Sequence, residues 1–417
     1  MTSTLYKNLW IVSQNAKRDI FYGDIFVEGN IFKRIGKISE DADNVIDCKG
    51  NVAIPGFINT HAHVAMANMK GIADDMHFDK FLETTFKYDS NRTEEEVEEN
   101  ALYGMAEMLL NGITTFADLY YFENAIVKSA IKANIRVHAA WAILDQEYTT
   151  QKGNPVDNCR AFIENVKENP NELVTPVVGV QGIYVANEET LHKARELATQ
   201  YNTYIHMHLS ETRKEVTDCV SKYGKRPVEW LDKIGFLDEN TLAAHSVWLT
   251  DKELQIYSQR KVKVSHCPSS NMKLAVGGIA PIPEMIHNNV VVSLGTDSVV
   301  SNNSLSMLWE MKLSSLLHKL SKWDATVVSA QTSFDMATIN GAKALKMDQE
   351  IGSIEEGKKA DFIILDKTNI AFYPFSKERI ISSIVYSADR SAIKEVIVNG
   401  KTSVKEGRIV SFNSPFT

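Results

Sequence analysis

The sequence predicts an α/β protein: a (β/α)₈ barrel of the TIM type with a small β-sandwich-like domain built from both chain ends. Two patterns support this, since apolar segments alternate with long helical segments in the middle, while both ends are rich in short strands and turns. The length of 417 residues fits a large barrel with an accessory domain. An open, doubly wound sheet is the main alternative, but the sequence has no G-x-G-x-x-G or Walker-type loop to support it.

The two chain ends share the same pattern of short strands and tight turns. Strands are expected at residues 8–13, 24–27, 31–38 and 45–53, and again at 361–365, 395–398, 401–404 and 408–410. Gly29-Asn30 and Asn399-Gly400 are turn signals between such strands. We therefore expect residues 1–55 and 350–417 to form one composite β domain, and residues 56–349 to form the barrel.

Eight short apolar segments are the expected barrel strands: residues 52–57, 113–118, 136–141, 175–181, 204–209, 241–245, 262–266 and 290–296. Helices are expected between them, most clearly at residues 94–110, 188–201, 213–223, 250–260 and 304–320. Eight strands alternating with helices over about 290 residues fit the size and pattern of a (β/α)₈ barrel.

Composition and charge exclude several classes of partner. The formal net charge of −8 argues against nucleic acid and anionic membranes as partners, because both favour basic surfaces. The four cysteines are widely spaced and form no C-x-x-C pair, which favours a reducing compartment.

The N-terminal segment does not have the pattern of a signal peptide, and no apolar run reaches the roughly 18–20 residues of a membrane span. We expect a cytoplasmic protein.

A pair of histidines follows the first expected barrel strand. In an extended backbone, residues two apart point the same way, so the rings of His61 and His63 can reach one metal ion. The alternative is that both are incidental polar residues at a strand end. The apolar run Pro55-Gly56-Phe57-Ile58 favours the metal site, because it would deliver the pair to the mouth of the barrel.

Three further titratable residues end or follow the fifth expected strand. His206 and His208 alternate onto one side, but His206 lies deeper in the strand, so we expect His208 to be the metal ligand and His206 to be structural. Glu211 falls where the strand becomes a loop above the pocket. The alternative for Glu211 is a carboxylate in the first turn of a helix, where the helix dipole favours negative charge.

The sixth and eighth expected strands also end in candidate site residues. His245 follows Ala243-Ala244, and Asp297 follows the glycine turn in Leu294-Gly295-Thr296. Singly, His245 fits a buried core histidine and Asp297 fits a helix N-cap. Together with the preceding residues, they lie at the carboxyl ends of strands, the face on which barrel enzymes build active sites.

Two neighbouring residues at the end of the seventh expected strand carry less information. His266 is expected either to line the pocket or to have a structural role. Cys267 has only its position to support it as a nucleophile.

These motifs together resemble the amidohydrolase superfamily, in particular the branch that contains methylthioadenosine/S-adenosylhomocysteine deaminases, guanine deaminases and triazine chlorohydrolases. The resemblance covers nearly the whole chain and runs through residues 55–63, 206–211, 244–245, 265–274, 294–305 and 352–361. The last of these segments, Gly-Ser-Ile-Glu-Glu-Gly-Lys-Lys-Ala-Asp, is similar to the one by which family members return to their β domain.

The resemblance implies a site for one divalent metal ion, Zn²⁺ or, as in some relatives, Fe²⁺. Its ligands would be His61, His63, His208 and Asp297. Binuclear members of the superfamily generally use a carboxylated lysine on the fourth strand, and residues 175–184 contain no lysine. In such a site a water molecule is acidified from a pKa of about 15.7 to near 7.

The resemblance also implies roles for three residues in the reaction. Asp297 would accept the proton of the acidified water, and His245 would direct the hydroxide at a ring carbon. Glu211 would protonate the neighbouring ring nitrogen and help the amine to leave, which is worth roughly 10²–10⁴-fold in rate.

The expected substrate pocket departs from the family pattern. Gln181 takes the place of a histidine that contacts the purine in relatives, Phe81 stands in place of tryptophan, and Asp89 in place of a ribose-binding glutamate. Trp141 replaces an arginine, and Ser301 is available as a further contact. Neither the indole of Trp141 nor a single lysine can replace an arginine that binds a carboxylate through two hydrogen bonds. S-adenosylhomocysteine is therefore not the expected substrate.

Three functions are compatible with these residues. The first is hydrolytic deamination of an aminated heterocycle such as an adenosine derivative, another purine or a pyrimidine, which Glu211 favours because ammonia needs a proton donor to leave. The second is a triazine-type chlorohydrolase or an amidohydrolase that releases another group. The third is a barrel scaffold without catalysis, which the retention of every expected ligand argues against. By analogy with relatives, a homodimer or homotetramer is expected.

Overall fold

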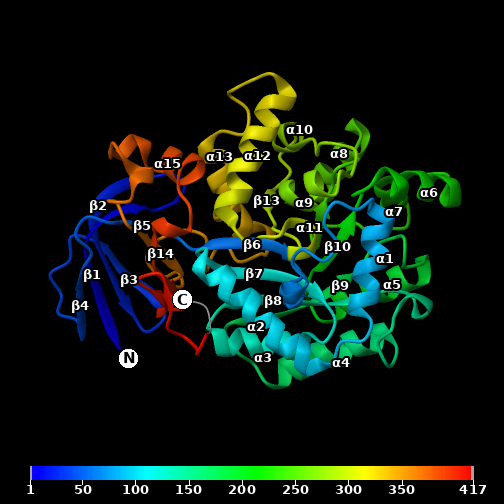
Figure 1. Cartoon of the computed structure of the whole chain (residues 1–417), viewed down its shortest axis with the longest axis horizontal. Coiled ribbons are helices and arrows are strands. Elements are labelled where there is room, and N and C mark those ends of the chain that lie inside the picture. Colours follow the sequence, from blue (N-terminus) through cyan, green and yellow to red (C-terminus); the bar gives the residue numbers. More distant parts are fainter. Residues whose placement is uncertain (1, 415–417) are drawn as a thin grey trace.

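The computed structural model describes residues 2–414, which form two β-sheets and the helices that cover them (Figure 1). One sheet has eight parallel strands and curves into a nearly closed barrel, and the other has nine strands that come from both chain ends. The predicted fold class, a (β/α)₈ barrel with a terminal β domain, is confirmed. The predicted domain boundaries at residues 55 and 350 stay a prediction.

The barrel strands follow one another around the barrel in chain order, as the right-handed crossovers of a (β/α) repeat require. They are β6 (Phe57–Ala62), β7 (Ile113–Tyr120), β8 (Arg136–Ile143), β9 (Val174–Val180), β10 (Ile205–Leu209), β11 (Thr241–His245), β12 (Lys263–His266) and β13 (Val292–Leu294). A parallel bridge between Ala62 and Asp297 links the last strand to the first, and the backbone N–H of Asp297 donates to the carbonyl of His61 at 2.9 Å.

Helices surround the barrel. They are α1 (Phe78–Asp89), α2 (Glu94–Leu110), α3 (Glu123–Ala133), α4 (Pro155–Glu168), α5 (Glu188–Gln200), α6 (Arg213–Tyr223), α7 (Pro227–Lys233), α8 (Asp251–Arg260), α9 (Pro268–Lys273), α10 (Ile282–His287), α11 (Val299–Asn302), α12 (Met307–Lys322), α13 (Ala330–Met336) and α14 (Ile339–Ala344). Thr93 and Thr250 close capping boxes at the starts of α2 and α8, which explains why these boundaries were predictable.

The terminal sheet combines strands from the two ends of the chain. The N-terminal part supplies β1 (Ser3–Val12), β2 (Ile20–Glu28), β3 (Ile31–Gly36), β4 (Asn44–Asp47) and β5 (Val52–Pro55). The C-terminal part supplies β14 (Phe362–Leu365), β15 (Ile393–Val398), β16 (Lys401–Lys405) and β17 (Arg408–Ile409), and α15 (Ile380–Tyr386) lies between β14 and β15. Strands β5 and β14 pair antiparallel and join the two parts. The sheet curls, so that Phe32 of β3 and Phe362 of β14 meet with ring centroids 5.6 Å apart.

The first barrel strand differs from its prediction. Residues 52–57 were expected to form it, but Val52–Pro55 belong to the terminal sheet and the barrel strand begins at Phe57. Gly56 is the point at which the chain passes from one sheet to the other. A Cβ atom at Gly56 would lie 2.1 Å from Oγ1 of Thr114, so only glycine fits there. The continuous apolar run of residues 52–57 therefore contains parts of two strands that belong to different sheets.

No helix within residues 2–414 combines the length and the apolar composition that crossing a bilayer demands.

Candidate metal centre and active-site pocket

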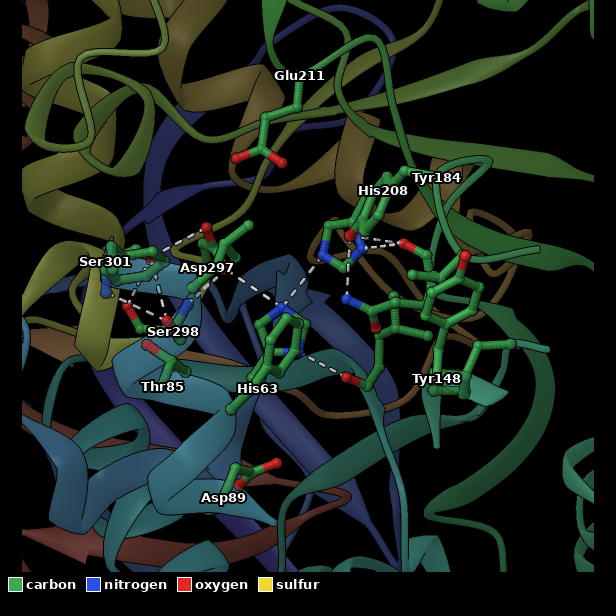
Figure 2. A pocket seen from close by; sticks show the side chains of 18 of the residues that line it. His63, Thr85, Asp89, Tyr148, Tyr184, His208, Glu211, Asp297, Ser298 and Ser301 are labelled. Carbon is green, nitrogen blue, oxygen red and sulfur yellow. Dashed lines mark hydrogen bonds and ion pairs between the residues drawn. The ribbon is translucent and has the colours of Figure 1, made fainter. Parts of the chain in front are cut away.

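Four side chains from three places on the barrel converge at its carboxyl-terminal mouth. Nε2 of His63 lies 3.3 Å from Nε2 of His208 and 3.3 Å from Oδ1 of Asp297. Nε2 of His61 lies 3.7 Å from the same Oδ1 atom. Figure 2 shows His63, His208 and Asp297 pointing toward one another within the pocket. The structure therefore brings together all four side chains that the sequence suggested as metal ligands.

The donor set fits a divalent metal ion. In a tetrahedral site with Zn–N and Zn–O distances near 2.0–2.1 Å, neighbouring ligand atoms lie roughly 3.3 Å apart, close to the separations seen here. Nε2 of His61 is buried and has no hydrogen-bond partner among the described residues. An unpartnered buried nitrogen is costly, and an ion at the centre would satisfy it. Three imidazoles and one carboxylate are ligands that zinc prefers.

Hydrogen bonds on the outer side of each ring fix its orientation. Nδ1 of His63 donates to the carbonyl of Leu119 and Nδ1 of His208 donates to the carbonyl of Gln181, both at 2.6 Å. Because Nδ1 carries the proton in these two rings, the Nε2 lone pairs face the centre. Nδ1 of His61 lies 2.9 Å from Nε2 of His206. His206 therefore supports the cluster from below, in the structural position expected of it.

Asp297 is held by three neighbours and stays ionised. Its Oδ2 accepts from the hydroxyls of Ser270 at 2.5 Å and Ser301 at 3.0 Å, and its Oδ1 accepts from the backbone N–H of Ser298 at 2.7 Å. Burial opposes ionisation, but the nearby imidazoles of His63, His61 and His245 hold the pKa of Asp297 well below its usual range. The residue has φ of +60°, a strained conformation of the kind that clusters at functional sites.

Glu211 and His245 lie beside the four-residue cluster. Oε1 of Glu211 is 3.9 Å from Nε2 of His245, and a ligand atom of His245 lies within 4.8 Å of those of His61 and His208. Nδ1 of His245 is hydrogen-bonded to Oδ1 of Asn271 at 2.9 Å, which orients the ring. Burial raises the pKa of Glu211. A carboxyl group that keeps its proton near neutral pH can act as a general acid.

A cavity of about 460 Å³ opens above the cluster, within the range of small-molecule sites. Figure 2 shows Glu211, Tyr184 and Tyr148 on one side of it and Thr85 and Asp89 on the other. Much of the wall is apolar or aromatic and includes Phe78, Phe81, Leu82, Phe86, Tyr120, Tyr121, Leu144 and Tyr148. The cavity thus combines a largely apolar wall with the histidines, Glu211 and Asp297 on its lining.

Four of the five predicted pocket residues line this cavity: Phe81, Asp89, Gln181 and Ser301. Trp141 is not among the described residues that line the cavity, and its contact with a substrate stays a prediction. Trp141 lies on β8, where alternate residues face the barrel interior, and its ring instead packs outward against Phe162 of α4 at a centroid distance of 5.9 Å.

Asp89 belongs to a buried polar cluster at the edge of the cavity. The hydroxyl of Tyr120 donates to Oδ1 of Asp89, and Nη1 of Arg92 lies 3.5 Å from the same carboxylate. Burial raises the pKa of Asp89, although these two partners oppose the shift. Oγ1 of Thr85, one helical turn earlier on α1, is buried and has no partner among residues 2–414. Both side chains can therefore take a polar group of a ligand.

Sequence reasoning missed several residues that complete the site. Asn271 orients His245, and the carboxylate of Glu215 accepts hydrogen bonds from the backbone N–H groups of Ser210 and Glu211. Glu215 lies three residues after Thr212, the spacing of an ordinary helix start, and Thr212 does cap α6. The sequence pattern therefore indicated helix capping and not the contact of Glu215 with the backbone of Ser210 and Glu211.

His266 and Cys267 are not part of the cavity wall. Nε2 of His266 lies 3.2 Å from Nε2 of His318 in a buried pair, so the structural alternative describes His266. Burial raises the pKa of Cys267 well above its usual value, which leaves the thiol protonated and unsuited to act as a nucleophile.

Comparisons with known proteins agree with this geometry. A family model described as "Amidohydrolase family" matches residues 52–403. The chain is 39% identical over 413 residues to a 5-methylthioadenosine/S-adenosylhomocysteine deaminase of Thermodesulfovibrio yellowstonii, covering 96% of this chain and 92% of the relative. It is 36% identical over 394 residues to a 5'-deoxyadenosine deaminase of Methanobrevibacter smithii, covering 94% and 90%. The crystal structure of an adenosine deaminase from Xanthomonas campestris with bound zinc superposes with a TM-score of 0.93 and 25% identity, covering 99% of this chain and 95% of that one.

Proposed function

Because the chain belongs to the amidohydrolase family and is a hydrolase, we propose that it deaminates an adenosine derivative by hydrolysing the bond between the adenine ring and its exocyclic amine. The observation that carries this proposal is the position of Glu211, a buried carboxyl with a raised pKa beside His245 and the metal-ligand cluster. Ammonia is a poor leaving group without a proton, and Glu211 is the group placed to supply one.

One zinc ion is the proposed cofactor. Its ligands are His61, His63, His208 and Asp297, whose separations suit tetrahedral coordination. When bound, such an ion supplies an acidified water molecule as nucleophile near neutral pH.

The protein side chains then handle the protons. Asp297 is ionised and accepts the proton of the attacking water, while its serine and backbone partners keep its carboxylate in place. Nε2 of His245 faces the cavity and holds the attacking oxygen in line with the ring carbon. Glu211 gives its proton to the adjacent ring nitrogen. Asp297 then passes its proton to the exocyclic amine, which leaves as ammonia, while the added hydroxyl returns its proton to Glu211 and its oxygen stays on the ring.

The cavity supports a nucleoside with an uncharged substituent at its 5' carbon. Asp89 and Thr85 offer an acceptor and a hydroxyl for the sugar, and Gln181 offers both a donor and an acceptor for the ring edge. Among the described residues that line the cavity, Lys214 is the only lysine or arginine, and its Nζ is paired with Asp218 at 2.6 Å. The described cavity lining therefore offers no unpaired lysine or arginine that could bind a carboxylate or a phosphate. This favours a 5'-deoxyadenosine-type substrate over S-adenosylhomocysteine.

An ammonia-release assay with zinc-loaded protein tests the proposal. We expect turnover of 5'-deoxyadenosine and 5'-methylthioadenosine to exceed that of S-adenosylhomocysteine, guanine, cytosine and aminotriazines. In Glu211→Gln, ammonia release should fall by about 10²–10⁴-fold while the zinc content per chain is kept. Hydrolysis of 6-chloropurine ribonucleoside should fall less, because chloride leaves without a proton.

The same assay separates the other functions. If aminated substrates are inert and a chlorinated triazine reacts, the protein is a chlorohydrolase and the deaminase proposal fails. If the protein retains no metal from zinc-containing buffer and turns over none of these compounds, the scaffold alternative holds.

A further inference from the structure

The outer face of α12 carries an apolar stripe, which we call the α12 stripe: Trp309, Leu313, Leu316, Leu320 and Trp323. Trp323, the residue that ends the helix, is 96% exposed, and Leu320 is 76% exposed. Trp309 and Leu316 are each about half exposed, and Leu313 is partly buried. In Figure 1, α12 lies at the top of the molecule beside α13 and is drawn in yellow.

The stripe is not needed to hold α12 in place. The opposite face of the helix is buried and carries Met307, Met311, Ser314, Ser315 and His318. Oγ of Ser315 donates to the carbonyl of Val328 at 2.7 Å, and His318 pairs with His266. The helix therefore packs through this buried face, and residues 2–414 leave its apolar outer face uncovered. A surface helix normally keeps its outer face polar.

The exposed area is large enough for a specific interface. A large apolar or aromatic side chain presents about 150–250 Å² when fully exposed, so the four most exposed residues contribute on the order of 500–600 Å². Two copies of the stripe would bury about 1,000–1,200 Å², the lower end of stable protein interfaces before flanking residues are added. A contiguous patch of this size on one chain usually marks an interaction site.

The spacing of the stripe makes it complementary to itself. Trp309 and Trp323 lie seven residues before and seven residues after Leu316. When two copies of α12 cross antiparallel about a two-fold axis at Leu316, Trp309 of each copy faces Trp323 of the other. Leu316 then meets its own counterpart on the axis. An isologous dimer requires this kind of symmetric patch, and a repeat of seven residues is the one that keeps two helices in contact.

We propose that the α12 stripe is the interface of a two-fold symmetric homodimer in which two α12 helices pack antiparallel and cross at Leu316. The occupant of the stripe is thus a second copy of this chain. The inference is independent of the proposed deaminase activity, because the stripe lies outside the cavity and none of its residues lines it.

Charge at the crossing point tests the dimer. Sedimentation velocity of the wild-type chain at tens of micromolar should give a dimer, while Leu316→Lys and Leu316→Glu should each give monomers, because like charges would meet on the axis. An equimolar mixture of the two variants should regain the dimer. Ile370→Lys, at another exposed apolar residue that is 83% accessible, is the matched control and should remain dimeric. An unchanged far-UV circular dichroism spectrum of each variant shows that the chain is folded.

Cysteine cross-linking tests the direction of the helices. The native cysteines Cys48, Cys159, Cys219 and Cys267 are all buried, so an introduced surface cysteine reacts selectively. Leu316→Cys should cross-link to itself on oxidation. Trp309→Cys and Trp323→Cys should cross-link to each other when mixed but not alone, because the two positions are about 21 Å apart along the helix. A monomeric wild type, dimers unaffected by Leu316→Lys, or efficient self-cross-linking of Trp309→Cys would each overturn the proposal.

Discussion

Glu215 holds Glu211 in place through the main chain: Oε2 of Glu215 accepts a hydrogen bond from the backbone N–H of Glu211 at 2.8 Å. Its Oε1 accepts from the backbone N–H of Ser210, also at 2.8 Å. Ser210 has φ of +53°, a conformation that non-glycine residues adopt only when their surroundings enforce it. Glu215 thus fixes the sharp turn by which the chain leaves β10 and aims the Glu211 carboxyl into the cavity.

Glu215→Gln is therefore expected to lower kcat by about 10- to 100-fold, because a small displacement of a reacting group has a cost of that order. The amide can accept only one of the two backbone hydrogen bonds and places its own N–H₂ against the other donor. KM and zinc content should change little, since Glu215 contacts no ligand of the metal centre. Steady-state kinetics would measure kcat and KM separately, and metal analysis would measure the zinc content.

A matched control is Glu253→Gln, which alters another buried carboxylate in the first turn of a barrel helix. Glu253 serves the capping box of α8 and binds Arg226 at 2.7 Å, away from the cavity. This control should lower thermal stability and leave kcat unchanged. If Glu253→Gln reduces kcat as strongly as Glu215→Gln, the effect of Glu215 is general destabilisation.

The pH dependence of turnover should report Glu211. Burial raises the pKa of this carboxyl, so its protonated form persists to higher pH than that of an exposed glutamate. Because the reaction uses that proton, kcat/KM for deamination should fall as pH rises through the raised pKa. The fall should be shallower with 6-chloropurine ribonucleoside, whose chloride needs no proton. If kcat/KM falls equally steeply at high pH for both substrates, the group that titrates is not Glu211.

Removal and return of zinc should change stability as well as activity. Without an ion, Nε2 of His61 is left buried and unpartnered. A free zinc concentration 100 times the dissociation constant stabilises the native state by about 2.7 kcal/mol. We therefore expect the Tm of chelator-treated protein to rise by a few degrees on zinc addition.

Two histidine variants make the zinc experiment specific. His61→Ala should abolish the zinc-dependent shift in Tm. His192→Ala, at a half-exposed histidine on α5, should keep it. A shift that persists in His61→Ala would place the stabilising ion elsewhere.

The convergence of the four candidate ligands was predictable because it follows from strand geometry alone. His61 and His63 alternate onto one side of an extended segment, and the carboxyl ends of parallel strands meet at one mouth of a barrel. His208 and Asp297 end other strands of the same barrel. Each position could thus be assigned without knowing any tertiary contact, and the structure places them within reach of one ion.

Residues whose position depends on local irregularities could not be predicted in the same way. The passage of the chain between sheets at Gly56 interrupts an apolar run that resembles one strand. Trp141 was assigned to the pocket from the family resemblance. Its direction depends on which residues of β8 face the barrel interior, and Trp141 is one of those that face outward. Glu215 acts through backbone groups of a strained turn, which no residue pattern reveals.

A buried ion pair between the barrel and the terminal sheet gives the last prediction. Arg136 at the start of β8 and Asp361 just before β14 are 1% and 2% exposed, and Nη2 lies 3.1 Å from Oδ2. Removing one partner of a buried pair typically costs about 3–5 kcal/mol, because the other charge is left without compensation. Asp361→Ala should therefore lower the free energy of unfolding by about this amount in urea denaturation.

The double variant Arg136→Met with Asp361→Leu should be less destabilised than Asp361→Ala, because neither charge is then stranded in the interior. Asp218→Ala is the control, since it breaks the pair with Lys214, whose two side chains are 64% and 61% exposed. An exposed pair contributes about 0–1 kcal/mol, so this variant should be nearly neutral. If Asp361→Ala is as mild as Asp218→Ala, the buried pair does not stabilise the junction between the two sheets.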